Sequence, residues 1–169
     1  ELKPQAHRKL HPLLRSKNVD SRLVILITPD RGLVGGLNLN IIREAIKFIQ
    51  ENKNTKFITV GQKGLAATTR LNAEVLASFG SEEIPFIDLA RTLAKMAVAA
   101  FKIGDVGEAY VIYPNFESIL KQTPKVNRIL PIKFSEETEY LKSHGNGVIP
   151  NMIFEPSADH ILESILPHH

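Results

Sequence analysis

The run Arg22 to Thr28 (RLVILIT) constrains the fold of this chain more than any other feature of its sequence. Between its two ends every residue is apolar, so the run predicts a strand that is buried on both faces. Strands of this kind belong mostly to parallel sheets, whose connecting helices cover both faces. The run therefore predicts an α/β protein with this strand at the centre of its sheet.

The segments that follow alternate between helical and extended patterns. From Asn38 to about Glu51, apolar residues recur at the spacing of a helix with one apolar face. The alternation continues with a strand at 56–60, a helix at 63–71, a strand at 73–79 and a helix from Pro85 that Gly104 stops. Since strands that alternate with helices form parallel sheets, these segments extend the sheet begun by the first strand.

Two further extended segments end the predicted sheet. They cover Glu108 to Leu120 and Lys125 to Ile132, and the short link Gln122 to Pro124 between them predicts an antiparallel hairpin. The whole pattern predicts an α/β fold: a Rossmann-like three-layer sandwich with a mostly parallel sheet that ends in an antiparallel hairpin.

We expect four segments along the chain. We interpret residues 1–20 as a linker or the end of a helix, residues 21–134 as the α/β domain, residues 135–154 as an exposed loop and residues 155–169 as the start of a new helix. A short amphipathic helix needs a partner that buries its apolar face, and the sequence offers none. We therefore expect the chain to be truncated at both ends.

Composition excludes several classes of protein. With 43% hydrophobic residues the chain has enough apolar area for a core, and the lack of cysteine excludes disulfides, thiolate metal sites and cysteine nucleophiles.

The net charge of +3 is too small to indicate a nucleic-acid groove, and the basic first segment lacks interleaved aromatic residues that would stack on bases. No apolar run approaches the roughly 20 residues of a membrane-spanning helix, so we expect neither nucleic-acid binding nor a spanned membrane.

A loop with three glycines lies between the first strand and the first helix. This order suggests a dinucleotide site, because backbone amides at a helix start can hold a phosphate. However, Gly32, Gly35 and Gly36 form G-x-x-G-G instead of G-x-G-x-x-G, and no lysine follows them as in a phosphate loop. Asp30 would also place a negative charge beside a pyrophosphate. A tight structural turn is the favoured interpretation, and a Rossmann-type nucleotide- or dinucleotide-binding domain is the alternative.

The sequence supplies no recognisable set of residues for catalysis or metal binding. His7 and His11 have a helical spacing but no third ligand nearby, and no serine can be assigned the His and Asp partners that activate a nucleophile. Glu82 and Glu83 precede a helix, where carboxylates favourably meet the positive end of the helix dipole. We therefore expect no catalytic residue, no metal and no cofactor.

The segment TPDRGLVGGLN, residues 28–38, closely resembles the signature T-S-D-R-G-L-C-G-G-L-N of gamma subunits of F-type ATP synthases. Pro29 and Val34 depart from the usual serine and cysteine. The resemblance covers nearly the whole chain, because further segments occur in the family's order. They are HPLL at 11–14, VGQKG at 60–64, YPNFES with QTP between 113 and 124, LPI at 130–132 and FEPSADHIL at 154–162.

The resemblance marks a structural family motif within the glycine loop. Its residues are Asp30, Arg31, Gly32, Gly35, Gly36 and Asn38. We expect Asp30 to cap the turn and Asn38 to cap the helix that follows. The glycines suit strained or closely packed backbone, and we expect Arg31 to reach a nearby carboxylate or carbonyl.

The resemblance implies a rotor subunit that performs no bond chemistry itself. In the family, the first and last helices form a coiled-coil shaft inside a hexamer of alpha and beta subunits. Rotation of the shaft couples the proton-driven c ring to ATP synthesis in that hexamer. This chain then corresponds to the globular foot of the subunit, with the end of the first shaft helix and the start of the last.

The implied partners are the epsilon subunit (called delta in mitochondria), the c ring, and the alpha and beta subunits. The cysteine-bearing insertion of chloroplast-type gamma subunits has no counterpart in this sequence. The resemblance therefore implies a protein peripheral to the membrane, on the cytoplasmic face of the bacterial plasma membrane or, alternatively, on the matrix side of the mitochondrial inner membrane.

Overall fold

The computed structural model describes residues 12–30, 36–81, 84–118 and 121–132, which fall within one compact unit, Glu1–Ile132. The expectations for residues 1–11, for the loop 135–154 and for the helix 155–169 lie outside the described residues. The elements, in chain order, are the short 3₁₀ helix η1 (Pro12–Leu14), β1 (Arg22–Ile27), α1 (Leu37–Glu51), β2 (Thr55–Val60), α2 (Gln62–Arg70), β3 (Glu74–Phe79), α3 (Phe86–Lys102), β4 (Glu108–Ser118) and β5 (Lys121–Leu130).

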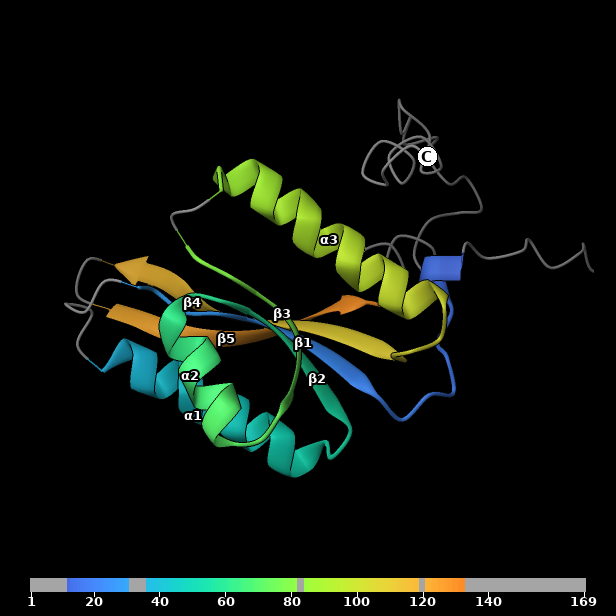
Figure 1. Ribbon diagram of the computed structural model, residues 1–169, viewed down its shortest axis with the longest axis horizontal. Coiled ribbons are helices and arrows are strands. Elements are labelled where there is room, and N and C mark those ends of the chain that lie inside the picture. Colours follow the sequence, from blue (N-terminus) through green and yellow to red (C-terminus); the bar gives the residue numbers. More distant parts are fainter. Residues whose placement is uncertain (1–11, 31–35, 82–83, 119–120, 133–169) are drawn as a thin grey trace, which may run out of the picture. The chain divides into compact units, whose positions relative to one another are not determined.

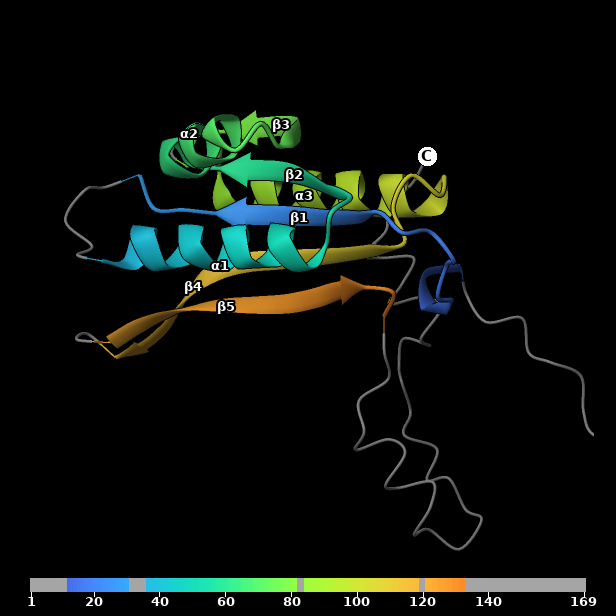
Figure 2. The ribbon, with the colours of Figure 1, turned by 90° about the horizontal axis from the view of Figure 1, so that it is seen from below.

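Five strands form one sheet in the order β3-β2-β1-β4-β5, and Figure 2 shows them one above another. β1 pairs in parallel with β2 on one side and with β4 on the other, and β2 pairs in parallel with β3. β5 pairs antiparallel with β4. The central position of the first strand and the mostly parallel sheet with an antiparallel hairpin are therefore confirmed.

Helices cover both faces of this sheet. α1 and α2 lie on one side of it and α3 lies on the other (Figure 1). The connections through α1 and α2 step in one direction along the sheet, whereas α3 leads back past β1 to β4. Because crossovers between parallel strands keep one hand, this reversal of direction puts α3 on the opposite face. The predicted three-layer sandwich is confirmed.

The hydrophobic core lies on both sides of β1, which is buried from Leu23 to Leu26. On the side of α1, alternate residues of β1 pack in one cluster with that helix and the neighbouring strands. The cluster consists of Val24, Leu26, Leu37, Ile41, Ala45, Phe48, Phe57 and Ile112. Side chains alternate along a strand, so the remaining residues of β1 point to the face of α3, where Leu89, Leu93 and Phe101 are buried.

The start and stop signals of α3 act as the sequence predicts. Pro85 stands just before the first helical residue, where its missing N–H removes no helical hydrogen bond. Gly104 lies two residues after the last helical residue and has φ of +81°, a left-handed conformation that favours glycine. The helix therefore ends where the backbone can turn without strain.

The turn of the β4–β5 hairpin lies earlier in the chain than the sequence predicts. The expected link at Gln122 to Pro124 is part of β5, and Pro124 is paired with Pro114 of β4. Only the part of β4 up to Ile112 pairs with β1, so both prolines lie where the hairpin extends beyond the parallel sheet. A proline cannot donate a ladder hydrogen bond, and an edge of this kind tolerates it. The predicted link at Gln122 to Pro124 was wrong for that reason.

Candidate functional site

Two regions of the domain carry the features that the sequence singled out. At the carboxyl end of β1, the structure describes the first and last parts of the glycine motif. Arg31, Gly32 and Gly35 lie outside the described residues. At the amino end of β1, the segment before this strand meets the end of α3 and the end of β5. We call residues 12–21, 101–108 and 130–132 the corner.

Thr28 holds the carboxyl end of β1 against the start of α2. Its backbone N–H and its hydroxyl both donate to the Val60 carbonyl, at 2.9 Å and 3.1 Å. The hydroxyl accepts from the Gly64 N–H at 3.0 Å, and the side chain is buried. A Cβ at Gly61, which has φ of +94°, would lie 2.2 Å from the Thr28 carbonyl oxygen. The two glycines of the VGQKG segment are thus explained by their contacts with Thr28.

The Asp30 carboxylate joins three loops at this edge of the sheet. It accepts a hydrogen bond from the Gln62 N–H, the first of α2, at 2.6 Å. It also accepts from the Ser81 N–H at 3.1 Å and from the Ser81 hydroxyl. The hydrogen bonds from Ser81 and then from the Gln62 amide lower the pKa of this carboxyl below its usual value. The bond from the Gln62 N–H thus caps the start of α2, and the bonds from Ser81 hold the segment that leads to α3. The expected cap of the turn by Asp30 stays a prediction, because residues 31–35 lie outside the described residues.

The position of Asp30 has a consequence for anion binding. Its negative charge lies at the edge of the sheet where Rossmann-type domains place the phosphates of a cofactor. The amide at the start of α2 is already bound to this carboxylate. A pyrophosphate at this edge would meet electrostatic repulsion from Asp30, so the geometry opposes the nucleotide-binding alternative.

Asn38 does not cap α1, which corrects the expectation from the sequence. The helix begins at Leu37 with Gly36 in the capping position, and that position makes no side-chain capping hydrogen bond. The Asn38 amide instead donates to the Pro29 carbonyl at 3.3 Å. The helix starts one residue earlier than predicted, so Asn38 lies inside its first turn and reaches back to the preceding segment.

At the corner, the segment that leads into β1 is bonded to the segment that leaves β5. The Ile132 N–H donates to the Leu13 carbonyl at 2.8 Å. The Leu13 side chain is 2% exposed, so this contact is anchored in the core. The two backbone paths that connect the described domain to the remainder of the chain therefore lie side by side.

We call residues 12–21, which lead into β1, the incoming segment. Gly107 lets this segment pass close to the start of β4. Its N–H donates to the Ser21 carbonyl at 2.8 Å. A Cβ at this position would lie 2.3 Å from the Val19 carbonyl oxygen and 3.3 Å from that of Lys17. No side chain fits in that space, so glycine is required by the close approach of two backbones.

Lys17 ties the incoming segment to the end of α3. Its ammonium donates to the Phe101 carbonyl and, at 2.8 Å, to the Lys102 carbonyl. It also lies 5.0 Å from the centre of the Phe101 ring, within the range of a cation–π contact. A cation there is favourable because the last carbonyls of a helix carry partial negative charge.

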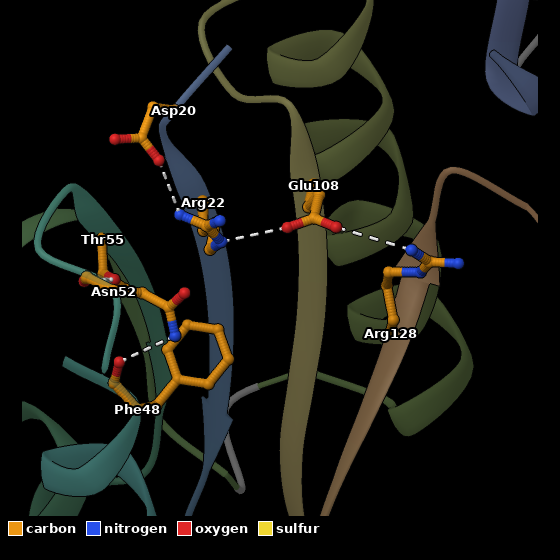
Figure 3. Close-up of polar contacts among 7 residues, drawn as sticks. All are labelled: Asp20, Arg22, Phe48, Asn52, Thr55, Glu108 and Arg128. Atoms are coloured by element: carbon orange, nitrogen blue, oxygen red, sulfur yellow. Dashed lines mark hydrogen bonds and ion pairs between the residues drawn. The ribbon is translucent and has the colours of Figure 1, made fainter. Parts of the chain in front are cut away.

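A chain of charged side chains crosses three strands beside the corner (Figure 3). Arg22 of β1 pairs with Asp20 at 3.0 Å and with Glu108 of β4 at 3.0 Å. Glu108 also pairs with Arg128 of β5 at 3.5 Å. The side chains of Arg22, Glu108 and Arg128 are only about a quarter exposed, at 24%, 28% and 24%. The network therefore joins the amino ends of β1 and β4 to the last part of β5.

The described residues carry features of a structural site. Across residues 12–30, 36–81, 84–118 and 121–132, no group of three or more acidic, histidine or cysteine side chains could hold a metal ion. Within the same residues, no helix has the length and apolar character needed to cross a membrane. The contacts that stand out fix one backbone segment against another. The arrangement is suited to holding the described backbone segments in fixed positions relative to one another.

The fold and the corner define a Rossmann-like α/β module whose first and last described segments are bonded to each other through Leu13 and Ile132. A family model described as ATP synthase matches residues 1–169. The chain therefore belongs to the ATP synthase family.

Curated relatives agree with this family assignment. The ATP synthase gamma chain of Desulfitobacterium hafniense is 34% identical over 164 residues, which cover 94% of this chain and 54% of the relative. The gamma chain of Acidothermus cellulolyticus is 34% identical and covers 94% of this chain and 55% of its own length. The resemblance to gamma subunits is thus confirmed, and the chain spans about half the length of the curated relatives it matches.

Solved structures show the same fold. A chain of the Tetrahymena thermophila mitochondrial ATP synthase, central stalk and c-ring, matches with a TM-score of 0.58 and 24% identity, over 69% of this chain and 52% of that one. A chain of the Euglena gracilis mitochondrial ATP synthase rotor matches with a TM-score of 0.52 and 18% identity, over 96% of this chain and 65% of that one.

Proposed function

We propose that this chain is the globular foot of the central-stalk rotor subunit of an F-type ATP synthase, with the adjoining ends of its shaft helices. Residues 21–134 form the foot, residues 1–20 are the end of the first shaft helix or a linker, residues 135–154 form an exposed loop and residues 155–169 start the last shaft helix. The family model over residues 1–169 and the curated gamma chains support this proposal.

The observation that carries the proposal is the bond between the two connecting segments. A shaft of two helices needs both of its connections to the foot at one place. The hydrogen bond from the Ile132 N–H to the Leu13 carbonyl, at 2.8 Å, meets that requirement. Connections at opposite ends of the sheet would not.

In this role the subunit couples proton-driven rotation of the c ring to ATP synthesis in the alpha and beta hexamer. The foot performs no bond chemistry and carries torque between the c ring and the shaft, because a close-packed core transmits strain instead of absorbing it. Its partners are the c ring, the epsilon subunit (delta in mitochondria) and, through the shaft, alpha and beta. The subunit is peripheral to the membrane, and its bacterial relatives favour the cytoplasmic face of a bacterial plasma membrane.

Rotation of the assembled complex tests this proposal. The sequence of this chain contains no cysteine, so Lys47→Cys on the exposed side of α1 gives a single site in the foot for an optical probe. The full-length subunit that carries this domain is assembled with the alpha and beta subunits of its own organism. We expect ATP to drive continuous one-way rotation of the probe, and no rotation without ATP. A hexamer that hydrolyses ATP while the probe stays still would contradict the proposal.

The nucleotide-binding alternative has its own test. The Asp30 carboxylate opposes a phosphate at the carboxyl edge of the sheet, so we expect calorimetry to detect no tight binding of ATP to residues 12–132. A dissociation constant in the micromolar range would support the alternative instead.

A further inference from the structure

Lys17 bonds the segment before β1 to the carboxyl end of α3. Its side chain is half-buried between the incoming segment and the end of α3. The ammonium donates to the carbonyls of Phe101 and Lys102 and lies 5.0 Å from the centre of the Phe101 ring. Phe101 is completely buried, so Lys17 rests on a part of the domain that is fixed by the core.

The end of α3 does not need Lys17 in order to stop. The Phe101 carbonyl also accepts from the Gly104 N–H at 3.2 Å, and the Ala100 carbonyl accepts from the Asp105 N–H at 3.0 Å. The left-handed Gly104 ends the helix by backbone geometry alone. The hydrogen bond between the Lys17 ammonium and the Lys102 carbonyl is exposed to solvent, so water can replace the ammonium at that carbonyl. Capping of α3 alone therefore does not explain why Lys17 makes these contacts.

Lys17 lies between two other points at which the incoming segment is fixed. On one side, the Leu13 carbonyl is bonded to Ile132 at 2.8 Å. On the other side, the Ser21 carbonyl is bonded to Gly107 at 2.8 Å. Between these two points, the Lys17 side chain bonds the segment to the carboxyl end of α3. Without it, the interval would lose these described side-chain bonds to α3.

We propose that Lys17 is a positioning residue that carries torque between the incoming segment and α3. The inference rests on the proposed rotor function, in which that segment leads from the shaft into the foot. A turning shaft pulls the segment sideways, and the ammonium passes the force to the carboxyl end of α3. The electrostatic contact resists bending of the segment while it contributes little to the stability of the fold.

Angular fluctuations of the assembled rotor test the inference. The full-length subunit, labelled at Lys47→Cys, is assembled with alpha and beta, and the angle of the probe is recorded while the complex is stalled. Lys17→Met keeps the length of the side chain and removes the ammonium. We expect it to widen the angular distribution and to lower the torque against a viscous load, with an ATP hydrolysis rate at low load like that of the parent.

Three further variants make the test specific. Lys17→Arg keeps a cation that can donate to both carbonyls, so we expect it to restore the narrow distribution. Lys95→Met removes an exposed lysine from the middle of α3 and should leave the distribution unchanged. If Lys17→Met does not assemble, Lys17→Gln, which keeps a neutral donor, is measured in the same way, and we expect a wider distribution than that of the parent.

The possible outcomes separate the two proposals. A parent complex that rotates, with Lys17→Met or Lys17→Gln as stiff as the parent, overturns the role of Lys17 and leaves the rotor function standing. The same widening in Lys95→Met, or a failure of Lys17→Arg to narrow the distribution, also overturns it. A parent complex that hydrolyses ATP without rotation contradicts the rotor function itself.

Discussion

Single residues decide how closely the loops of this domain can approach each other. The Thr28 carbonyl and hydroxyl lie directly against the backbone of Gly61 and Gly64, and Gly107 lies against Val19 in the same way. Backbone atoms distant in the chain require glycine at positions 61 and 107, whereas Gly64 packs tightly on the Thr28 side chain. Because each glycine is far in the sequence from the residue that it contacts, the sequence alone does not show why a glycine occupies that position.

Gly61→Ala tests the contact with Thr28. The added Cβ would lie 2.2 Å from the Thr28 carbonyl oxygen, in a backbone with φ of +94°. We expect the free energy of unfolding to fall by roughly 2–5 kcal/mol, because backbone strain and overpacking act together. Urea denaturation measures the change. Gly36→Ala is the matched control, since φ is −78° and nothing lies within 4 Å of the added Cβ. An equal loss in both variants would refute this account.

Asp30→Asn tests the carboxylate that joins three loops. The folded-state pKa of Asp30 lies below its unfolded value near 3.8, because Ser81 and the Gln62 amide bind the charged form. Its contribution to stability is therefore complete above that unfolded value and is lost as the pH falls through the lower folded value. We expect Asp30→Asn to be less stable than the parent at neutral pH and to lose less stability on acidification. Denaturation curves from neutral pH down to about pH 3 measure the difference, with Glu51→Gln, an exposed carboxylate, as the control.

At the scale of elements, the sheet is joined across its strands by charge as well as by backbone hydrogen bonds. Glu108 binds Arg22 of β1 at 3.0 Å and Arg128 of β5 at 3.5 Å. The antiparallel strand β5 has the sheet on one side only. The ion pairs therefore hold the edge strand in register close to the corner.

Glu108→Gln leaves two arginines facing a neutral side chain. These arginine side chains are each 24% exposed, so the lost interaction is partly screened by water. We expect a loss of about 1–2 kcal/mol in the free energy of unfolding. Asp88→Asn breaks the pair with Arg91, whose side chains are 54% and 69% exposed, and should cost less than about 0.5 kcal/mol. Equal costs would show that burial does not govern these pairs.

At the scale of the whole domain, the corner fixes where the chain arrives and leaves. Leu13 is buried in the core and bonded through its carbonyl to Ile132, although the two residues lie near opposite ends of the described chain. The side-by-side connection suits a paired shaft in the proposed function.

Leu13→Ala tests the corner as a unit. Loss of the buried side chain should cost about 2–5 kcal/mol of unfolding free energy. We also expect the Ile132 amide to exchange its hydrogen much faster, because the Leu13 carbonyl accepts its hydrogen bond and the Leu13 side chain holds that carbonyl in place. Hydrogen exchange measured by NMR tests both effects. Leu14→Ala, at a half-buried position next to it, should cause smaller changes in both. Unchanged protection of Ile132 in Leu13→Ala would contradict the account.

Several predictions from the sequence depended on patterns that lie within one element or at its end. The buried run of β1, the apolar face of α1 and the stop at Gly104 are of this kind, and the structure confirms them. The expected cap by Asn38 and the expected turn at Gln122 to Pro124 were wrong. In both cases the residue types fitted a local rule, but neighbouring segments of the fold offered other partners. The roles of Arg31, Gly32 and Gly35 stay predictions.

The sequence by itself determined the class of fold and the family, because periodic burial and short motifs are local properties of a chain. Only the tertiary structure decided which residues hold the domain together at its two edges. Asp30 meets Ser81 across 51 positions, and Lys17 meets Lys102 across 85. These contacts exist because the packing of helices on the sheet brings distant loops within the few ångströms over which a hydrogen bond forms.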